Sequence, residues 1–392
     1  MDDLRQRLRE LPCGRRLLDA AAGMDGVYLV GGAVRDLLLH RTPRELDVVV
    51  EGDVRALAQR LGRDAVATAH ERFGTATVRD GDCRWDLAAA RDESYARPGA
   101  LPDVRPAGIE PDLRRRDVTI NALALDLATG ELRGAPNAEA DLAAGRLRVL
   151  HDASFADDPT RLWRVARYAA RLGFTPEEHT AQLARDAVRA GALGTVSAAR
   201  IGNELRLAVA EPDPVAALEA AVALDLAPWL EPDRALTERA LELLPAEEGR
   251  ADLLVLAAAL AAPDDALLAG LQFTAAERAI VRAAAAAPPL DDAPRAPSQL
   301  ARELRGRPVE AIALAAARGG GTASARRWTQ ELRHVGVKIT GDDLRAAGIA
   351  EGADLGRRLQ AVLELRLDGV LGDDREAQLA AAMASAPEAG TA

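Results

Sequence analysis

The stretch that decides the fold is Val27-Tyr28-Leu29-Val30-Gly31-Gly32-Ala33-Val34-Arg35-Asp36, followed after a short helical segment by Glu45-Leu46-Asp47-Val48-Val49-Val50. The apolar run before the glycines predicts a buried strand, and the run 46–50 predicts a second one. The leucines at 37–39 suit a packed helix between them. Gly31 and Gly32 allow the backbone to turn sharply and to approach a phosphate closely.

Two acids frame the start of the second predicted strand. Because side chains alternate along a strand, Glu45 and Asp47 are expected to share one face. Adjacent carboxylates repel each other, and a divalent cation between them would relieve that repulsion. Oxygen-only ligands beside a triphosphate indicate Mg²⁺. Asp86, in the predicted strand Arg84-Trp85-Asp86-Leu87, either completes a three-carboxylate site or is an ordinary strand-end aspartate.

A second block concentrates charge: Arg114-Arg115-Arg116-Asp117-Val118-Thr119-Ile120-Asn121-Ala122. On a helix, Asp117 and Asn121 would lie on one face because they are four residues apart. An acid and an amide beside arginines suit ribose hydroxyls and phosphate. A solvated, charged helix face is the alternative.

A third block is Asp157-Asp158-Pro159-Thr160-Arg161-Leu162-Trp163-Arg164-Val165-Ala166-Arg167-Tyr168. Pro159 after Asp158 predicts a helix start capped by the aspartate. The arginines recur every three residues and so form a stripe. Asp158 can accept from an amino group of a base, Arg161 can donate to ring acceptors, and Arg164 and Arg167 can hold phosphates. The alternative is a helix cap followed by solvated arginines.

Composition sets the broad class. The chain has 392 residues, 48% of them hydrophobic and 3% aromatic, and a net charge of −11. That charge argues weakly against nucleic-acid binding. Residues 295–338 are nevertheless a basic island with nine Lys or Arg and three Glu. The island suits an RNA backbone, or else consists of solvated helices rich in arginine.

The two cysteines, Cys13 and Cys83, form no C-x-x-C pair. We therefore expect free thiols in a reducing cytoplasm, with neither a disulfide nor a zinc site. The N-terminus is charged, and no apolar run reaches the ~18 residues of a membrane span, so no membrane association is expected. The second half has no H-x-x-x-H-D pattern, so no metal phosphohydrolase domain is expected.

Patterning along the chain predicts an α+β protein. Residues 1–22 suit one amphipathic helix, and short strand-like runs then alternate with helices until about residue 135. These runs are 26–31, 46–51, 65–69, 75–79 and 83–90. From about residue 140 the pattern is helical, with a proline-rich linker at 288–297.

In their order, the three blocks resemble the class II tRNA nucleotidyltransferases, which are the CCA-adding enzymes and bacterial poly(A) polymerases of the DNA polymerase beta-type superfamily. The match covers residues 26–205, with a weaker one at Ile339-Thr340-Gly341-Asp342-Asp343-Leu344. The resemblance implies a polymerase beta-like catalytic head with a mixed sheet and an elongated all-α C-terminal half. Its domains would be a head at 1–137, a base-recognising neck at 138–210, a body at 211–290 and a tRNA-binding tail at 291–392.

The resemblance also implies residue roles. Glu45, Asp47 and Asp86 would be catalytic, and Glu45 and Asp47 would hold Mg²⁺. Asp158 and Arg161 would read the base edge of CTP or ATP. The remaining nucleotide contacts would come from Gly31, Gly32, Arg35, Arg115, Arg116, Asp117, Asn121, Arg164 and Arg167.

Three residues depart from the family pattern. Glu45 stands where Asp is usual, Asp157 where Glu is usual and Val118 where Phe is usual. The stretch Arg91 to Asp112 corresponds to a flexible region linked in the family to the switch from C to A addition.

The expected function is template-independent addition of CMP, AMP or both to the 3′ end of tRNA, with release of diphosphate. C-only addition, A-only addition and poly(A) synthesis stay open, as does the oligomeric state. A nucleotidyltransferase acting on a small molecule or a protein fits less well, because the second and third blocks would be unexplained. A non-catalytic RNA-binding protein is disfavoured because Glu45 and Asp47 are both retained.

Overall fold

The computed structural model describes residues 2–62, 66–70, 74–262 and 264–384. It divides into two compact units, Met1–Pro228 and Trp229–Ala392. Among the described residues, every helix is too short or too polar to cross a membrane.

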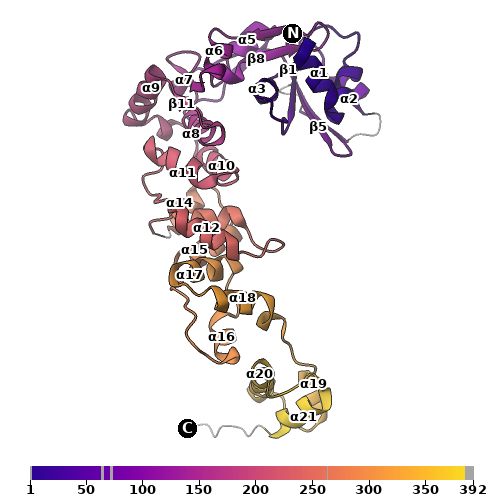
Figure 1. The fold of residues 1–392 in the computed structure, drawn as a ribbon, viewed down its shortest axis with the longest axis vertical. Helices are drawn as coiled ribbons and strands as arrows, with labels where there is room; N and C mark the ends of the chain where they lie inside the picture. The colour runs from indigo at the N-terminus through magenta and orange to yellow at the C-terminus, as the bar shows by residue number, and fades with distance from the viewer. Residues whose placement is uncertain (1, 63–65, 71–73, 263, 385–392) are drawn as a thin grey trace. The chain divides into compact units, whose positions relative to one another are not determined.

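The first unit is built on a mixed sheet of seven described strands in the order β3-β4-β5-β2-β1-β8-β9. Figure 1 labels β1, β5 and β8 of this sheet. Only β2 and β5 pair in parallel within it. Its strands are β1 (Val27–Val30), β2 (Leu46–Val50), β3 (Val66–His70), β4 (Thr75–Asp80), β5 (Cys83–Ala89), β8 (Leu123–Asp126) and β9 (Leu132–Gly134). The predicted α+β class and the five predicted strands are confirmed, although residue 65 lies outside the described residues.

Patterning missed six of the described strands, two of which, β10 (Arg146–Leu147) and β11 (Thr175–Pro176), have only two residues each. β8 and β9 follow the second charged block and complete one side of the sheet. β6 (Arg91–Ser94) and β7 (Asp103–Pro106) form a separate antiparallel hairpin. The hairpin strands are short and polar, so they lack the apolar alternation on which the prediction relied.

Helix α5 (Ile109–Arg114) covers one face of the sheet. Its Ile109 and Leu113 share a buried cluster with Tyr28, Val30 and Val49. Since side chains alternate along a strand, Asp47 lies on the same face as Val49. The predicted site therefore lies on the face that α5 covers, beyond the apolar contact.

The N-terminal segment is two helices, α1 (Asp2–Glu10) and α2 (Pro12–Ala20), and the prediction of one continuous helix is wrong. Pro12 explains the break, because proline has no N–H and its ring clashes with the preceding turn. Helix α3 (Gly32–Leu38) follows β1 as predicted, and α4 (Val54–Leu61) contacts β4 and β5.

The second charged block is not one helix, and that prediction is wrong too. Helix α5 ends at Arg114, and only a 3₁₀ turn, η2 (Thr119–Asn121), follows. The Asp117 carboxylate accepts from the Val118 backbone N–H at 2.8 Å, and Val118 is extended and bridges to Val149. A side chain that bonds its neighbouring backbone competes with helix formation.

The rest of the first unit is mainly helical. Helix α8 packs against α10 and α11. The elements are α6 (Ala138–Ala143), β10 (Arg146–Leu147), α7 (Ser154–Asp157), α8 (Thr160–Leu172), β11 (Thr175–Pro176), α9 (Glu178–Arg189), η3 (Ala192–Thr195), α10 (Ala198–Val209) and α11 (Pro214–Ala223).

The second unit contains only helices among its described regular elements. α12, α13, α15 and α17 contact one another, and a smaller cluster of Ile339, Leu344, Val362 and Ala382 lies near the C-terminus. The helices are α12 (Arg234–Leu243), α13 (Ala251–Ala259), α14 (Asp265–Gly270), α15 (Ala275–Ala285), α16 (Pro297–Leu304), α17 (Val309–Gly319), α18 (Thr322–Gln330), η4 (Leu332–His334), α19 (Gly341–Ala346), α20 (Ala353–Leu367) and α21 (Arg375–Ala384).

The predicted linker at 288–297 has no helix or strand before Pro297, but it is held in place. Leu290 is buried, and its N–H donates to the Ala315 carbonyl at 2.9 Å. The Asp292 carboxylate accepts from the backbone N–H groups of Ala323 and Ser324. The stretch therefore packs against α17 and α18.

Cys13 and Cys83 form a disulfide, so the expectation of free thiols is wrong. Cys13 lies on α2 and Cys83 begins β5, with Cα atoms 5.4 Å apart and a sequence separation of 70. The indole N–H of Trp85 donates to the Cys13 carbonyl at 3.1 Å, which shows how closely α2 packs on β5. Such proximity comes from tertiary packing and leaves no mark on cysteine spacing.

We predict that the variant Cys13→Ser/Cys83→Ser is less stable than the oxidised wild type. Closing a loop of this length restricts the unfolded chain and stabilises by about 4 kcal/mol in the chain-entropy model. Denaturant unfolding followed by circular dichroism would measure the difference. Dithiothreitol should lower the wild-type stability to that of the variant and leave the variant unchanged. Two titratable thiols in unreduced, unfolded wild type would contradict the bridge.

Candidate functional site

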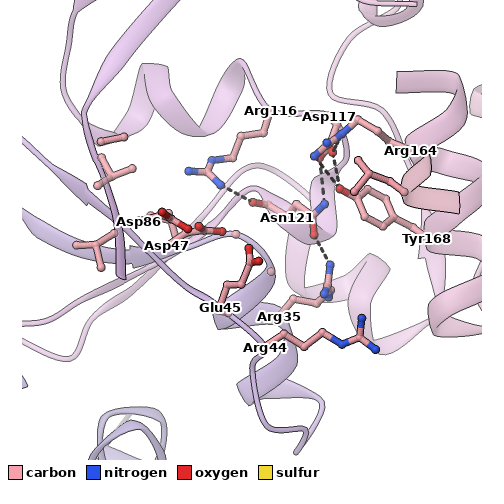
Figure 2. Close-up of a pocket in the computed structure, with 18 of the residues that line it drawn as sticks. Arg35, Arg44, Glu45, Asp47, Asp86, Arg116, Asp117, Asn121, Arg164 and Tyr168 are labelled. Carbon is pink, nitrogen blue, oxygen red and sulfur yellow. Dashed lines mark hydrogen bonds and ion pairs between the residues drawn. The ribbon is translucent and has the colours of Figure 1, made fainter. Parts of the chain in front are cut away.

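Three carboxylates meet on the face of the sheet beside α5 (Figure 2). The parallel register of β2 and β5 places Asp47 directly opposite Asp86, and Glu45 immediately precedes β2. Oxygens of all three lie within 4.8 Å of one another. The structure thus brings together the three acids that the sequence nominated.

Each oxygen of Asp86 already has a partner. The Thr77 hydroxyl donates to Oδ1 at 2.6 Å, and the Arg84 guanidinium lies 2.9 Å from Oδ2. Arg84 is also 3.8 Å from Glu45. A protein cation therefore partly balances the cluster.

The electrostatics of Asp47 show how crowded the acids are. Burial and the neighbouring charge of Glu45 raise its pKa from 3.8 to about 6, against an opposing contribution from Arg116. A carboxyl that resists ionisation is expected where like charges are close and water is scarce. The all-oxygen donor set matches the preference of Mg²⁺, so these residues fit such an ion.

Gly31 sets the approach of an arginine to this cluster. Its φ is +68°, and a Cβ there would lie 2.7 Å from Nη1 of Arg116. Arg116 donates to the Asp112 carboxylate at 3.0 Å and to the Asn121 carbonyl at 3.3 Å. Its Nε–H is buried and has no acceptor among the described residues.

Asp117 is the hub of a buried polar network (Figure 2). One oxygen accepts from the Asn121 amide at 3.1 Å; the other accepts from Arg164 Nε at 2.7 Å and the Tyr168 hydroxyl at 2.9 Å. Asn121 in turn accepts from Arg35 at 2.7 Å. The network joins α3, η2 and α8, so Asp117 and Asn121 act together without sharing a helix.

The pKa values within this network follow from its contacts. Burial alone would raise the pKa of Asp117, but the charge of Arg164 and the hydrogen bonds from Asn121, Arg164 and Tyr168 outweigh it and leave the pKa well below its usual range. Burial raises the pKa of Tyr168 to about 12. Asp117 is therefore ionised and Tyr168 neutral at pH 7.

Asp158 and Arg161 lie at the start of α8. Oδ1 of Asp158 accepts from the Thr160 N–H at 3.0 Å and the Thr160 hydroxyl at 2.6 Å, as the predicted cap requires. Arg161 is buried and donates to the Ser154 hydroxyl at 2.8 Å and the Arg115 carbonyl at 2.7 Å. A guanidinium has five N–H donors, so some remain for a ligand.

Asp157, which stands where the family usually has Glu, does not orient Arg161. The carboxylate of Asp157 lies 3.9 Å from His151, and Ser154 is the side chain that orients Arg161. Sequence reasoning missed Ser154. It also gave no role to Tyr168, the last residue of the third block, although Tyr168 lies one helical turn after Arg164 and an i, i+4 argument could have paired the two.

Two predicted arginines, Arg115 and Arg167, each pair with two protein carboxylates. Arg115 pairs with Asp112 at 2.7 Å and Glu93 at 3.0 Å. Arg167 is buried between Glu204 at 2.8 Å and Glu211 at 3.0 Å. These pairs tie Arg115 to β6 and Arg167 to the end of α10.

All fourteen predicted site residues line one cavity of about 910 Å³ in the first unit. This volume lies within the range of small-molecule sites and is large enough for a nucleoside triphosphate. The cavity runs from the acids on the sheet to the start of α8. It can place a cation, a polyphosphate and a base in contact with different parts of one wall.

Comparison with known proteins gives a consistent family. Residues 27–148 match the Poly A polymerase head domain. The A-adding tRNA nucleotidyltransferase of Geobacter sulfurreducens is 41% identical over 226 residues, 56% of this chain. This chain spans only 26% of that protein's length, and 46% and 23% of two further A-adding relatives.

Two other relatives match along nearly the whole chain. A solved structure of the Thermotoga maritima CCA-adding enzyme, complexed with tRNA, superimposes with a TM-score of 0.72 at 28% identity, covering 97% of this chain and 98% of that one. The CC-adding tRNA nucleotidyltransferase of Deinococcus radiodurans is 36% identical over 391 residues, 95% of this chain and 94% of that protein. The chain therefore belongs to the tRNA nucleotidyltransferase family.

Proposed function

We propose that this protein transfers CMP, AMP or both from CTP and ATP to the 3′-terminal hydroxyl of tRNA, without a nucleic-acid template and with release of diphosphate. The observation that carries the proposal is the single cavity in which three acids and the Asp158–Arg161 pair lie together. The functions named for the relatives agree with it.

The acids and arginines divide the work of phosphoryl transfer. Glu45 and Asp47 would hold Mg²⁺, with Asp86 beside them. When bound, Mg²⁺ supplies activation of the attacking hydroxyl and neutralisation of the departing diphosphate. The guanidinium groups of Arg35 and Arg116 line the same cavity and are suited to polyphosphate oxygens.

The neck side of the cavity reads the base. Oδ2 of Asp158 has no partner among the described residues, so it can accept a hydrogen bond from a ligand. Cytosine and adenine both present an amino group on the edge used for pairing, where uracil and guanine present a carbonyl oxygen. A fixed acceptor paired with the Arg161 donor therefore favours CTP and ATP over UTP and GTP.

C-only addition is the second candidate. The relative that aligns with 95% of this chain is a CC-adding enzyme, whereas A-adding relatives align with about half of it. Transcripts of tRNA that lack all or part of the CCA end, incubated with labelled CTP, ATP or both, separate these outcomes. Full CCA addition completes the end, C-only addition stops after the cytidines, and absence of labelled product with every transcript would overturn the proposal.

We predict that Asp47→Asn abolishes nucleotide incorporation while making the cation-free protein more stable at neutral pH. The folded pKa of Asp47 is raised, so its stabilising contribution is complete below pH 3.8 and is lost as the pH rises through about 6. A neutral amide avoids that loss, which is up to about 3 kcal/mol. Thermal unfolding in EDTA at pH 7.5 and pH 3.5 would show the gain only at the higher pH.

The matched control for this prediction is Glu45→Asp. It keeps both carboxylates and restores the usual family residue, so incorporation should survive. Near-normal turnover by Asp47→Asn would refute the assignment of the acids.

We predict that Asp158→Ala and Arg161→Ala each damage nucleotide selection more than tRNA binding. Each change removes a hydrogen-bonding partner worth roughly 1–3 kcal/mol when buried. The ratio of kcat/KM for CTP over UTP, and for ATP over GTP, should fall accordingly. Asp157→Asn is the control, because that carboxylate does not contact Arg161. Unchanged rejection of UTP and GTP would place base reading elsewhere.

In the basic island at 295–338, fewer cations are available to a ligand than the composition suggests, because several already bind protein groups. Five of its nine cations are engaged: Arg295 with Asp291 and Glu303, Arg302 with Glu364, Arg318 with the carbonyls of Ala284, Ala285 and Ala287, Arg333 with Glu248, and Lys338 with Asp373. Four exposed arginines have no carboxylate partner among the described residues, namely Arg305, Arg307, Arg326 and Arg327. They follow α16 or lie on α18, and these two helices contact each other.

We predict that these four arginines, the free-arginine set, contact the tRNA backbone. Replacing all four with Gln should weaken tRNA binding. The plot of log affinity against log salt should become shallower, by up to about 3 in slope, because each phosphate contact releases counterions. Filter binding across a salt series would measure both. CTP and ATP binding should not change, since the nucleotide cavity lies in the other unit.

A matched control removes the same charge from four exposed arginines that do have carboxylate partners: Arg302, Arg345, Arg357 and Arg375. Its tRNA affinity and salt slope should exceed those of the free-arginine variant. If both quadruple variants bind tRNA alike, net charge and not this surface governs binding.

A further inference from the structure

Arg200 is a charged residue of the cavity region that no part of the sequence reasoning assigned. It lies in the first turn of α10, 42 residues after Asp158. Its Nη2 donates to Oδ1 of Asp158 at 2.7 Å, the oxygen that already accepts from Thr160. The planar Arg200 guanidinium, bound to Oδ1, fixes the rotamer of Asp158 and leaves Oδ2 for a ligand.

The same guanidinium also holds the tip of the β6–β7 hairpin. Its Nη1 donates to the Gly99 carbonyl at 3.3 Å, and the Gly99 N–H donates to the Ala156 carbonyl at 3.0 Å. Gly99 has φ +69°, and a Cβ there would lie 2.2 Å from the Thr195 hydroxyl oxygen. Only glycine fits this approach, so the tip sits tightly against the start of α10 and the end of α7.

The hairpin itself belongs to the wall of the cavity. Glu93 on β6 and Pro102, immediately before β7, both line it. Glu93 accepts from the Tyr95 hydroxyl at 3.1 Å and pairs with Arg115, whose carbonyl accepts from Arg161. The hairpin is thus connected to Arg161 through Arg115 and to Asp158 through Arg200.

We infer that Arg200 is a positioning residue for nucleotide selection, because one guanidinium holds both the Asp158 carboxylate and the tip of a hairpin that lines the cavity. The inference rests on the proposed function for the identity of the nucleotides. A neutral residue at 200 would free the Asp158 side chain to rotate and would release the tip. Selectivity should then fall while the acids and the Asp117 network stay in place.

The first test compares Arg200→Gln with Arg200→Lys and with Arg189→Gln, a control that removes an equal charge from a surface ion pair with Asp186. Equilibrium binding of CTP, ATP, UTP and GTP to the full chain needs no catalysis. Arg200→Gln should weaken CTP or ATP binding about tenfold and lower its ratio to UTP or GTP binding. Lysine, which keeps the charge but not the fork, should restore part of that ratio.

Steady-state kinetics with excess tRNA give a readout that general destabilisation would not mimic. Arg200→Gln should raise the KM for the nucleotide more than it lowers kcat. Arg189→Gln is the reference variant, and its melting temperature should equal that of the wild type. Gly99→Ala should reproduce part of the selectivity loss because it displaces the tip without touching Asp158. Since both variants disturb one contact, the double variant should lose less than the sum of the two.

The outcomes separate this inference from the proposed function. Selective nucleotide binding by the wild type and by Arg200→Gln alike would overturn the role of Arg200, as would equal effects of Arg200→Gln and Arg189→Gln. Selective binding by the wild type without incorporation into any tRNA would overturn the proposed function, while the binding comparison would still decide the role of Arg200.

Discussion

The parallel pairing of β2 with β5 is the constraint on which the site depends. Its register sets Asp47 beside Asp86, and strand alternation directs both toward the face that α5 covers. Like charges at this distance oppose folding, as the raised pKa of Asp47 shows. The surrounding arginines reduce this cost without removing it, and the residual negative potential is what a divalent cation would bind.

Asp117 has a different role: it holds the helical wall of the cavity against the sheet. Its two oxygens accept four hydrogen bonds, from Val118, Asn121, Arg164 and Tyr168. Because these four donors satisfy the Asp117 carboxylate, its charge is stable although it is buried, and the network is rigid. A nucleotide that spans the cavity would therefore meet the three acids at one end and the Asp158–Arg161 pair at the other, at a separation that the network fixes.

Arginine supplies nearly all the positive charge of this chain, and contacts divide the arginines by role. Arg115, Arg167 and Arg200 are each tied to carboxylates and act on neighbouring elements. The free-arginine set of the second unit is exposed and has no carboxylate partner among the described residues. Composition counts these residues alike, although only unsatisfied donors are available to a ligand.

Sequence alone determined the features that depend on local order. Two-residue alternation brought Glu45 and Asp47 together, glycines at 31 and 32 indicated the turn, and the prolines at 12 and 159 lie where helices begin. The cavity gathers every residue that the resemblance of the three blocks nominated, together with others that it did not.

Tertiary structure decided what links residues far apart in the chain. The Cys13–Cys83 bridge spans 70 residues, Arg161 reaches Arg115 across 46 and Arg200 reaches Gly99 across 101. Periodicity carries no information over such separations, because these contacts arise from the packing of whole elements. The end of the helix at Arg114 escaped prediction for a related reason. The arginine-rich sequence favours a continuous helix, but Val118 instead forms a buried β-bridge with Val149, and that contact exists only in the folded chain.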